Sequence, residues 1–131
     1  MKRRVFMLAA GALSLGGLSS ALAQKPRVPL FPDIVGVKVK ASGADAFDFD
    51  VTVSSPYDRP ERYADAFRVM AQDGTVFGER VLLHDHADEQ PFTRDLRGVN
   101  IPGGIKEIVV QGRDQLSGYG GKKMVVKLPG R

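Results

Sequence analysis

Alternation of apolar and polar side chains is the feature that most constrains how this chain can fold. It is cleanest over residues 47–53, where two phenylalanines and two valines occupy every second position and aspartate or threonine lies between them. Successive side chains of a β-strand point to opposite faces of a sheet, so this pattern predicts a strand with one buried face.

Comparable segments recur along the chain and are separated by loop residues. We expect seven strands, at residues 34–40, 47–53, 63–71, 76–83, 92–96, 105–113 and 123–128. Asp73-Gly74 predicts a tight hairpin between the third and fourth strands, and Gly78 indicates a bulge or a close backbone approach. Val99 and Ile101 are expected to enter the core from a connection at residues 97–104, and residues 114–121 to form a Gly-rich turn.

Short strands at regular spacing, with no convincing helical segment, predict an all-β fold. We therefore expect a seven-stranded antiparallel sandwich of the immunoglobulin-like or fibronectin-like type over residues 34–131. The chain has no Cys, so the apolar core must supply the stability without disulfides.

The first 23 residues have the composition of an export signal. Lys2-Arg3-Arg4 precedes an apolar run at residues 5–18, and Ser19–Ala23 supplies the small residues of a cleavage site. Arg3-Arg4-Val5-Phe6-Met7 also fits a twin-arginine export motif, so either export route is open. We expect a mature chain that starts at Gln24, carries no membrane span or lipid anchor, and is periplasmic or secreted.

Residues 24–33 contain three prolines and are expected to form an extended, weakly held lead-in. The formal charge of +4 comes largely from the export signal, since removing residues 1–23 leaves 16 basic and 15 acidic side chains. A nearly neutral domain lacks the basic footprint of a nucleic-acid-binding protein, so we expect no nucleic-acid partner.

His84-Asp85-His86 is the strongest chemical candidate in the sequence. Residues two apart on an extended backbone face the same way, so both imidazoles could converge on one transition-metal ion. Asp88 and Glu89 could add oxygen ligands, which would suit iron, copper or zinc. The alternative is a solvated polar loop at a strand end.

Three further side chains are candidates for contact with a partner: Tyr57, Arg94 and Tyr119. Arg94 could clamp an anion with its planar guanidinium, or it could brace a loop by pairing with Asp88, Asp114 or Glu79. Tyr119 is expected at the tip of the last hairpin, where an exposed aromatic side chain suits an interface.

Ser54-Ser55-Pro56, followed by residues 61–67 with the sequence Glu-Arg-Tyr-Ala-Asp-Ala-Phe, resembles a stretch of the superoxide reductase (desulfoferrodoxin) family. That family has an immunoglobulin-like sandwich whose iron is held by four His and one Cys. The resemblance implies the sandwich alone, because Ser55 and Arg62 stand at the ligand positions and the chain has no Cys.

Gly112-Arg113-Asp114, followed by residues 118–122 with the sequence Gly-Tyr-Gly-Gly-Lys, is similar to the last hairpin of the sulfur-oxidation carrier subunits. Those subunits are small immunoglobulin-like periplasmic proteins that work by binding a partner. This resemblance implies the sandwich fold and the periplasmic compartment.

No Ser in the sequence lies in a recognisable His–carboxylate relay, so a hydrolase is not indicated. We expect an exported binding or accessory protein that acts without catalysis and binds another periplasmic protein. Its contacts would come from the loops at residues 54–62, 84–95 and 114–121, because alternate loops of a sandwich gather at one end. The alternative is a metal-binding, redox-related protein that uses the His84-Asp85-His86 loop.

Overall fold

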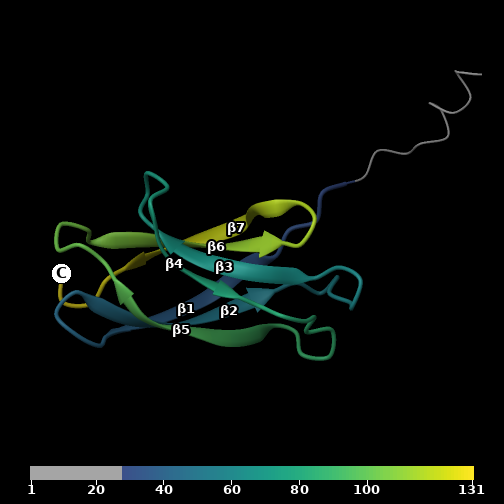
Figure 1. The fold of residues 1–131 in the computed structure, drawn as a ribbon, viewed down its shortest axis with the longest axis horizontal. Coiled ribbons are helices and arrows are strands. Elements are labelled where there is room, and N and C mark those ends of the chain that lie inside the picture. The colour runs from purple at the N-terminus through teal and green to yellow at the C-terminus, as the bar shows by residue number, and fades with distance from the viewer. Residues whose placement is uncertain (1–27) are drawn as a thin grey trace, which may run out of the picture.

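The computed structural model describes residues 28–131, which form seven strands in two layers (Figure 1). The export signal expected at residues 1–23 and the first part of the lead-in lie outside the described residues. The strands are β1 (Asp33–Ala41), β2 (Ala46–Ser54), β3 (Ala64–Met70), β4 (Val76–Val81), β5 (Phe92–Asn100), β6 (Glu107–Asp114) and β7 (Gly118–Lys127).

The two layers are a three-stranded sheet, in the order β1-β2-β5, and a four-stranded sheet, in the order β4-β3-β6-β7. Every neighbouring pair is antiparallel, and the chain crosses between the sheets after β2, β4 and β5. This confirms the predicted seven-stranded antiparallel sandwich. Across residues 28–131 no helix is present, and so none is long or apolar enough to cross a membrane.

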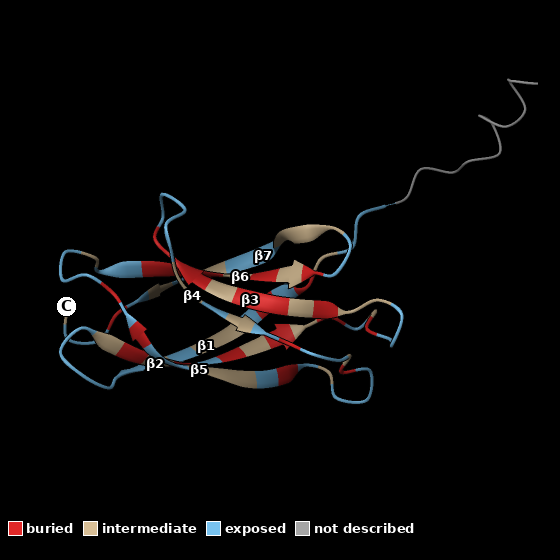
Figure 2. Cartoon of the chain, viewed as in Figure 1, coloured by how far each residue is buried: buried red, intermediate tan, exposed pale blue. Residues whose placement is uncertain are grey.

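The core lies between the two sheets and takes the inward-facing residues of each strand (Figure 2). Val99 and Ile101 are buried in it, as predicted. The largest fully buried apolar side chains are Phe49, Phe67, Phe92, Ile34, Ile101, Ile108, Val51, Val53, Val69 and Val110.

The hairpin expected at Asp73-Gly74 is confirmed. Gly74 has a φ of 97°, a left-handed conformation that glycine adopts at little cost, and the Ala71 N–H donates to the Thr75 carbonyl at 2.7 Å. Both expectations for Gly78 are also confirmed. The β3–β4 register shifts beside it, and a Cβ atom there would lie 3.3 Å from Val99 in the opposite sheet.

Two strands are longer than the alternation predicts. β5 continues to Asn100 through a shift in register against β2 near Phe47, so the expected connection at residues 97–104 is wrong in its first half. β7 begins at Gly118, which leaves a turn of residues 115–117 in place of the long Gly-rich turn. Irregular pairing explains both errors, because a bulge interrupts strict alternation while the strand continues.

The last residues of the lead-in, Phe31 to Asp33, are held against the sandwich, whereas residues 28–30 are exposed. Pro32 is buried, and the Lys122 N–H donates to the Asp33 carboxylate at 2.8 Å. Phe31 and Pro32 lie against Gly120 and Gly121, where an added Cβ atom would overlap them. The glycines of β7 therefore make room for the incoming chain, which reaches the sandwich at the end opposite the C-terminus (Figure 1).

Candidate functional site at the loop end of the sandwich

Three connections meet at one end of the sandwich, as the sequence predicted (Figure 1). They are the β2–β3 loop (residues 55–63), the β4–β5 loop (residues 82–91) and the β6–β7 turn (residues 115–117). We call this surface the loop end. Residues 92–95, which the sequence placed both in the second candidate loop and in a strand at residues 92–96, belong to β5, so the strand prediction is confirmed.

Asp114, at the end of β6, is the centre of the bonding at the loop end. Its side chain is fully buried, and its carboxylate accepts hydrogen bonds from Arg62 at 3.0 Å and from the Tyr57 hydroxyl at 2.7 Å. The backbone N–H groups of Leu116 and Ser117 donate to the same carboxylate at 2.8 and 2.7 Å. One carboxylate thus joins the β2–β3 loop to the β6–β7 turn.

Asp58 makes the second connection. Its buried carboxylate accepts from the backbone N–H of Ala64 and from that of His86, both at 3.0 Å. Gln90 adds a further connection, because its side chain accepts from the Ser55 N–H at 2.7 Å and donates to the His86 carbonyl at 3.0 Å. Two side chains, Asp58 and Gln90, therefore hold the β2–β3 and β4–β5 loops to each other.

The electrostatics keep Asp114 ionised. Burial would raise the pKa of this carboxyl, but the hydrogen bonds from Arg62, the Ser117 N–H and Tyr57 outweigh it and hold the pKa below its ordinary value. Burial, and then the bond to the negative Asp114, raise the pKa of the Tyr57 hydroxyl. Tyr57 is therefore a half-buried donor that supports the loop, and its hydroxyl already has its partner.

The two imidazoles of the predicted metal site lie side by side, with ring centroids 5.0 Å apart. His84 is exposed, and its Nδ1 lies 2.9 Å from the Asp85 carbonyl. His86 is 7% exposed and stacks on Phe92 at 3.9 Å between centroids, with its Nδ1 buried and without a partner. Burial, and then the nearby charges of Arg94 and His84, lower the pKa of His86.

The acidic residues proposed as further ligands lie on the same loop but are exposed. Glu89 pairs with Arg94 at 3.1 Å, which corrects the three partners suggested for that arginine. This bond from Arg94 also lowers the pKa of the Glu89 carboxyl. Among residues 28–131 no three His, Cys, Asp or Glu side chains are placed together to hold a metal ion. The four-residue metal site stays a prediction.

Tyr119 does not lie at the tip of a hairpin, because β7 already includes it. Its ring lies across the outer face of the four-stranded sheet, and the Arg68 guanidinium carbon lies 3.7 Å from the ring centroid. The Tyr119 hydroxyl donates to Glu79. Burial, and then this bond to Glu79, raise the pKa of the Tyr119 hydroxyl. The turn instead presents Leu116, which is 64% exposed.

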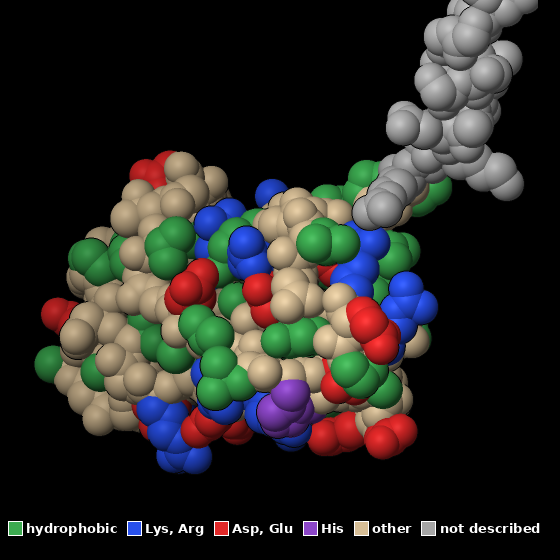
Figure 3. All heavy atoms as spheres, turned by 45° about the vertical axis from the view of Figure 1, so that its right-hand side comes forward, with side chains coloured by type: hydrophobic (Ala, Val, Ile, Leu, Met, Phe, Trp, Pro, Cys, Tyr) green, Lys and Arg blue, Asp and Glu red, His purple; other side chains and the backbone are tan. Residues whose placement is uncertain are grey.

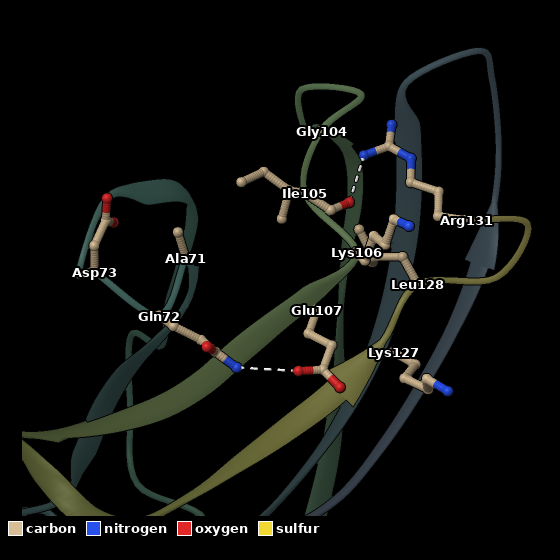
Figure 4. Close-up of a pocket in the computed structure, with 10 residues that line it drawn as sticks. All are labelled: Ala71, Gln72, Asp73, Gly104, Ile105, Lys106, Glu107, Lys127, Leu128 and Arg131. Atoms are coloured by element: carbon tan, nitrogen blue, oxygen red, sulfur yellow. Dashed lines mark hydrogen bonds between the residues drawn. The ribbon is translucent and has the colours of Figure 1, made fainter.

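A hollow of about 900 Å³ lies at the opposite end, beside the C-terminus (Figure 4). At its rim, a 3.1 Å hydrogen bond from Gln72 to Glu107 joins the β3–β4 turn to the start of β6. Nothing in the sequence marks this region. Its polar residues are scattered between positions 72 and 131, so no local motif could have indicated it. The lining residues are Ala71, Gln72, Asp73, Gly104, Ile105, Lys106, Glu107, Lys127, Leu128 and Arg131.

Fold and loop end together define an antiparallel β-sandwich with braced loops at one end. The chain is similar to a protein of Halomicrobium mukohataei named "Putative lipoprotein", with 39% identity over 94 residues. The matched region covers 72% of this chain and 46% of the relative, so the chain spans about half the length of the relative. No family model and no solved structure matches the chain.

Proposed function

We propose that this chain is an exported, non-catalytic binding module that holds another protein of the periplasm or cell envelope with its loop end. The name of the Halomicrobium relative supports the location, since lipoproteins are exported to the cell envelope. The predicted export signal at residues 1–23 supports it independently.

The observation that carries the proposal is the pair of buried carboxylates, Asp58 and Asp114, which brace the loops. Loops held on a rigid scaffold are where binding residues concentrate. Loops that are already ordered lose less conformational entropy when a partner binds. The bracing therefore favours a preformed recognition surface over a merely solvated set of connections.

The loop end also presents side chains suited to a protein partner. Leu83 is 82% exposed and Leu116 is 64% exposed. Tyr63 lies between them and forms hydrogen bonds to the backbone at or next to each leucine. The Tyr63 hydroxyl donates to the Leu83 carbonyl, and the Tyr63 carbonyl accepts from the Gln115 N–H. Acidic and basic side chains lie on the surface around the histidines (Figure 3). Apolar anchors within a polar rim are the usual anatomy of an interface.

Site-specific photo-crosslinking in the cells that export the protein tests this function. A photoreactive amino acid at position 59 of the β2–β3 loop is expected to form one dominant adduct with a second protein. The double variant L83S/L116S should lower the adduct yield about tenfold, because it removes two apolar anchors without disturbing the core.

The matched control places the same photoreactive amino acid at position 73, at the opposite end of the sandwich, where Asp73 is exposed. No adduct with that partner is expected there. Equal yields at positions 59 and 73, or a yield at position 59 that the double variant leaves unchanged, would contradict recognition by the loop end.

A second candidate function is metal binding by His84 and His86. It is favoured by the 5.0 Å spacing of the rings, because two imidazoles bound at about 2.0 Å to one tetrahedral ion have centroids at a similar separation. An exposed carboxylate of the same loop, such as Asp88, would complete the ligand set.

The metal content of the purified protein tests this second candidate function directly. The protein would be purified after export, without chelator or His tag, beside a H84A/H86A variant. Near-stoichiometric iron, copper or zinc that disappears in the variant is the result expected of a metal protein. Metal-free wild-type protein that also binds none of the three ions on titration would reject the candidate.

A further inference from the structure

We infer that the outer face of the four-stranded sheet is a self-association surface, and that its occupant is a second copy of this chain. The inference starts from a row of apolar side chains on the side of the sheet that faces away from the core. Strand register places Val76, Met70, Val109 and Val125 in line across β4, β3, β6 and β7. We call these four residues the outer apolar row.

None of the four belongs to the core between the sheets. Val76 and Val125, on the two edge strands, are 47% and 54% exposed. Met70 and Val109, on the two central strands, are 7% and 4% exposed. The polar bridges from Gln72 to Glu107 and from Arg68 to Gln111 join β3 to β6 on either side of the Met70–Val109 pair. The row is apolar on all four strands, which departs from the polar outer face typical of such sheets, and its two ends, Val76 and Val125, are open to solvent.

The charges around the row favour a copy of the same face as its partner. The β4 side of the face carries acidic groups, Glu79 on the strand and Asp73 in the preceding turn. The Glu79 carboxylate also accepts from the Tyr119 hydroxyl of the same chain, and Arg68 and Arg113 lie on the two central strands between the edges. The β7 side carries basic groups, Lys123 and Lys127. A face that is acidic along one edge and basic along the other is complementary to itself when the edges are exchanged.

A two-fold axis parallel to the strands, passing between β3 and β6, makes this exchange. It lays β4 of each copy on β7 of the other and so brings Val76 of one copy against Val125 of the other, with the buried Met70–Val109 pairs and their polar bridges near the axis. Because β4 and β7 run in opposite directions, the same rotation brings Glu79 towards Lys123 and Asp73 towards Lys127. Each contact then occurs twice, which is the property of an isologous interface.

The face is small, since four strands about 4.8 Å apart are only about 15 Å across. An interface of this size belongs with those that bury less than about 1,200 Å² in total, which are weak and transient. We therefore expect a reversible dimer with a Kd on the order of 10–100 µM, and one that weakens as salt screens the edge charges.

Sedimentation velocity of the exported protein, over a concentration series that spans this Kd, tests the inference. V125D is expected to raise the Kd by about tenfold or more, because it buries an unpaired charge. V35D is the matched control, since Val35 is a similarly exposed valine on β1 and should leave the Kd unchanged.

Charge reversal distinguishes this geometry from any other dimer. E79K and K123E should each weaken association several-fold, and the double variant E79K/K123E should restore it, because the pair is re-formed with its signs exchanged. Circular dichroism and thermal unfolding would show that each variant is folded. A wild-type protein that stays monomeric throughout the series, or a dimer indifferent to V125D and to charge reversal, would overturn the inference. Neither result bears on a partner held by the loop end.

Discussion

D114A is expected to lower the free energy of unfolding by about 3–5 kcal/mol, the usual cost of leaving a buried charge without its partner. The Arg62 side chain is only 15% exposed and would lose its carboxylate. The Tyr57 hydroxyl and the backbone N–H groups of Leu116 and Ser117 would lose their acceptor as well. Denaturant unfolding at neutral pH, followed by circular dichroism, measures the loss.

The pH dependence of the same measurement identifies the carboxylate as the cause. The folded-state pKa of Asp114 lies below its unfolded value of about 3.9, so its contribution is fully present above that value. The contribution is lost as the pH falls through the folded-state pKa. The difference in unfolding free energy between wild type and D114A should therefore be constant near neutral pH and shrink in acid.

D45A provides the control for this prediction. Asp45 also pairs with an arginine, Arg131 at 2.9 Å, but its side chain is 61% exposed. The Arg131 side chain is 10% exposed, but it also donates to the carbonyls of Pro102, Ile105 and Ile101 and keeps these partners without Asp45. Losing the exposed Asp45 carboxylate should therefore cost only about 0–1 kcal/mol at any pH. If D114A costs no more than D45A, the network at Asp114 does not hold the loops together.

The strands could be predicted from the sequence because alternation is a local signal. The run of two phenylalanines and two valines at residues 47–53 is read within seven positions, and the structure has β2 over Ala46–Ser54. The gathering of three loops at one end followed from the order of strands in a sandwich. These features need no knowledge of which side chains meet.

The bracing of the loop end could not be predicted in this way. Arg62 and Asp114 are 52 positions apart, and nothing local distinguishes Asp114 from the other aspartates of the chain. The ion-pair partner that the sequence suggested for Asp114 was Arg94, whereas Arg94 pairs with Glu89 five positions away. Contacts between distant loops depend on the packed fold, so both buried carboxylates became visible only in the structure.

The glycines of β7 predict a long turn from the sequence, but the structure requires two of them for a different reason. Gly118-Tyr119-Gly120-Gly121 has the composition of a turn, and glycine is the residue that turns require most often. In the structure the turn is already complete at Ser117. Gly120 and Gly121 are needed because the lead-in, at Phe31 and Pro32, lies against the strand.

G121A is therefore expected to lower the free energy of unfolding by about 2–5 kcal/mol, from two causes that add. Gly121 has a φ of +77°, which an alanine adopts only with strain. The added Cβ atom would also overlap the carbonyl oxygen of Pro32, which belongs to the backbone and cannot swing aside. Thermal and denaturant unfolding of the variant beside the wild type measure the combined loss.

Two matched variants separate the causes. G74A introduces the same backbone strain, since Gly74 has a φ of +97°, but its new Cβ atom meets nothing within 4 Å. It should therefore cost about 1–2 kcal/mol. G103A introduces neither strain nor overlap and should change stability by less than about 0.5 kcal/mol. A G121A variant no less stable than G74A would mean that the lead-in does not lie on β7. A clear excess would show that Phe31 and Pro32 of the lead-in are part of the folded sandwich.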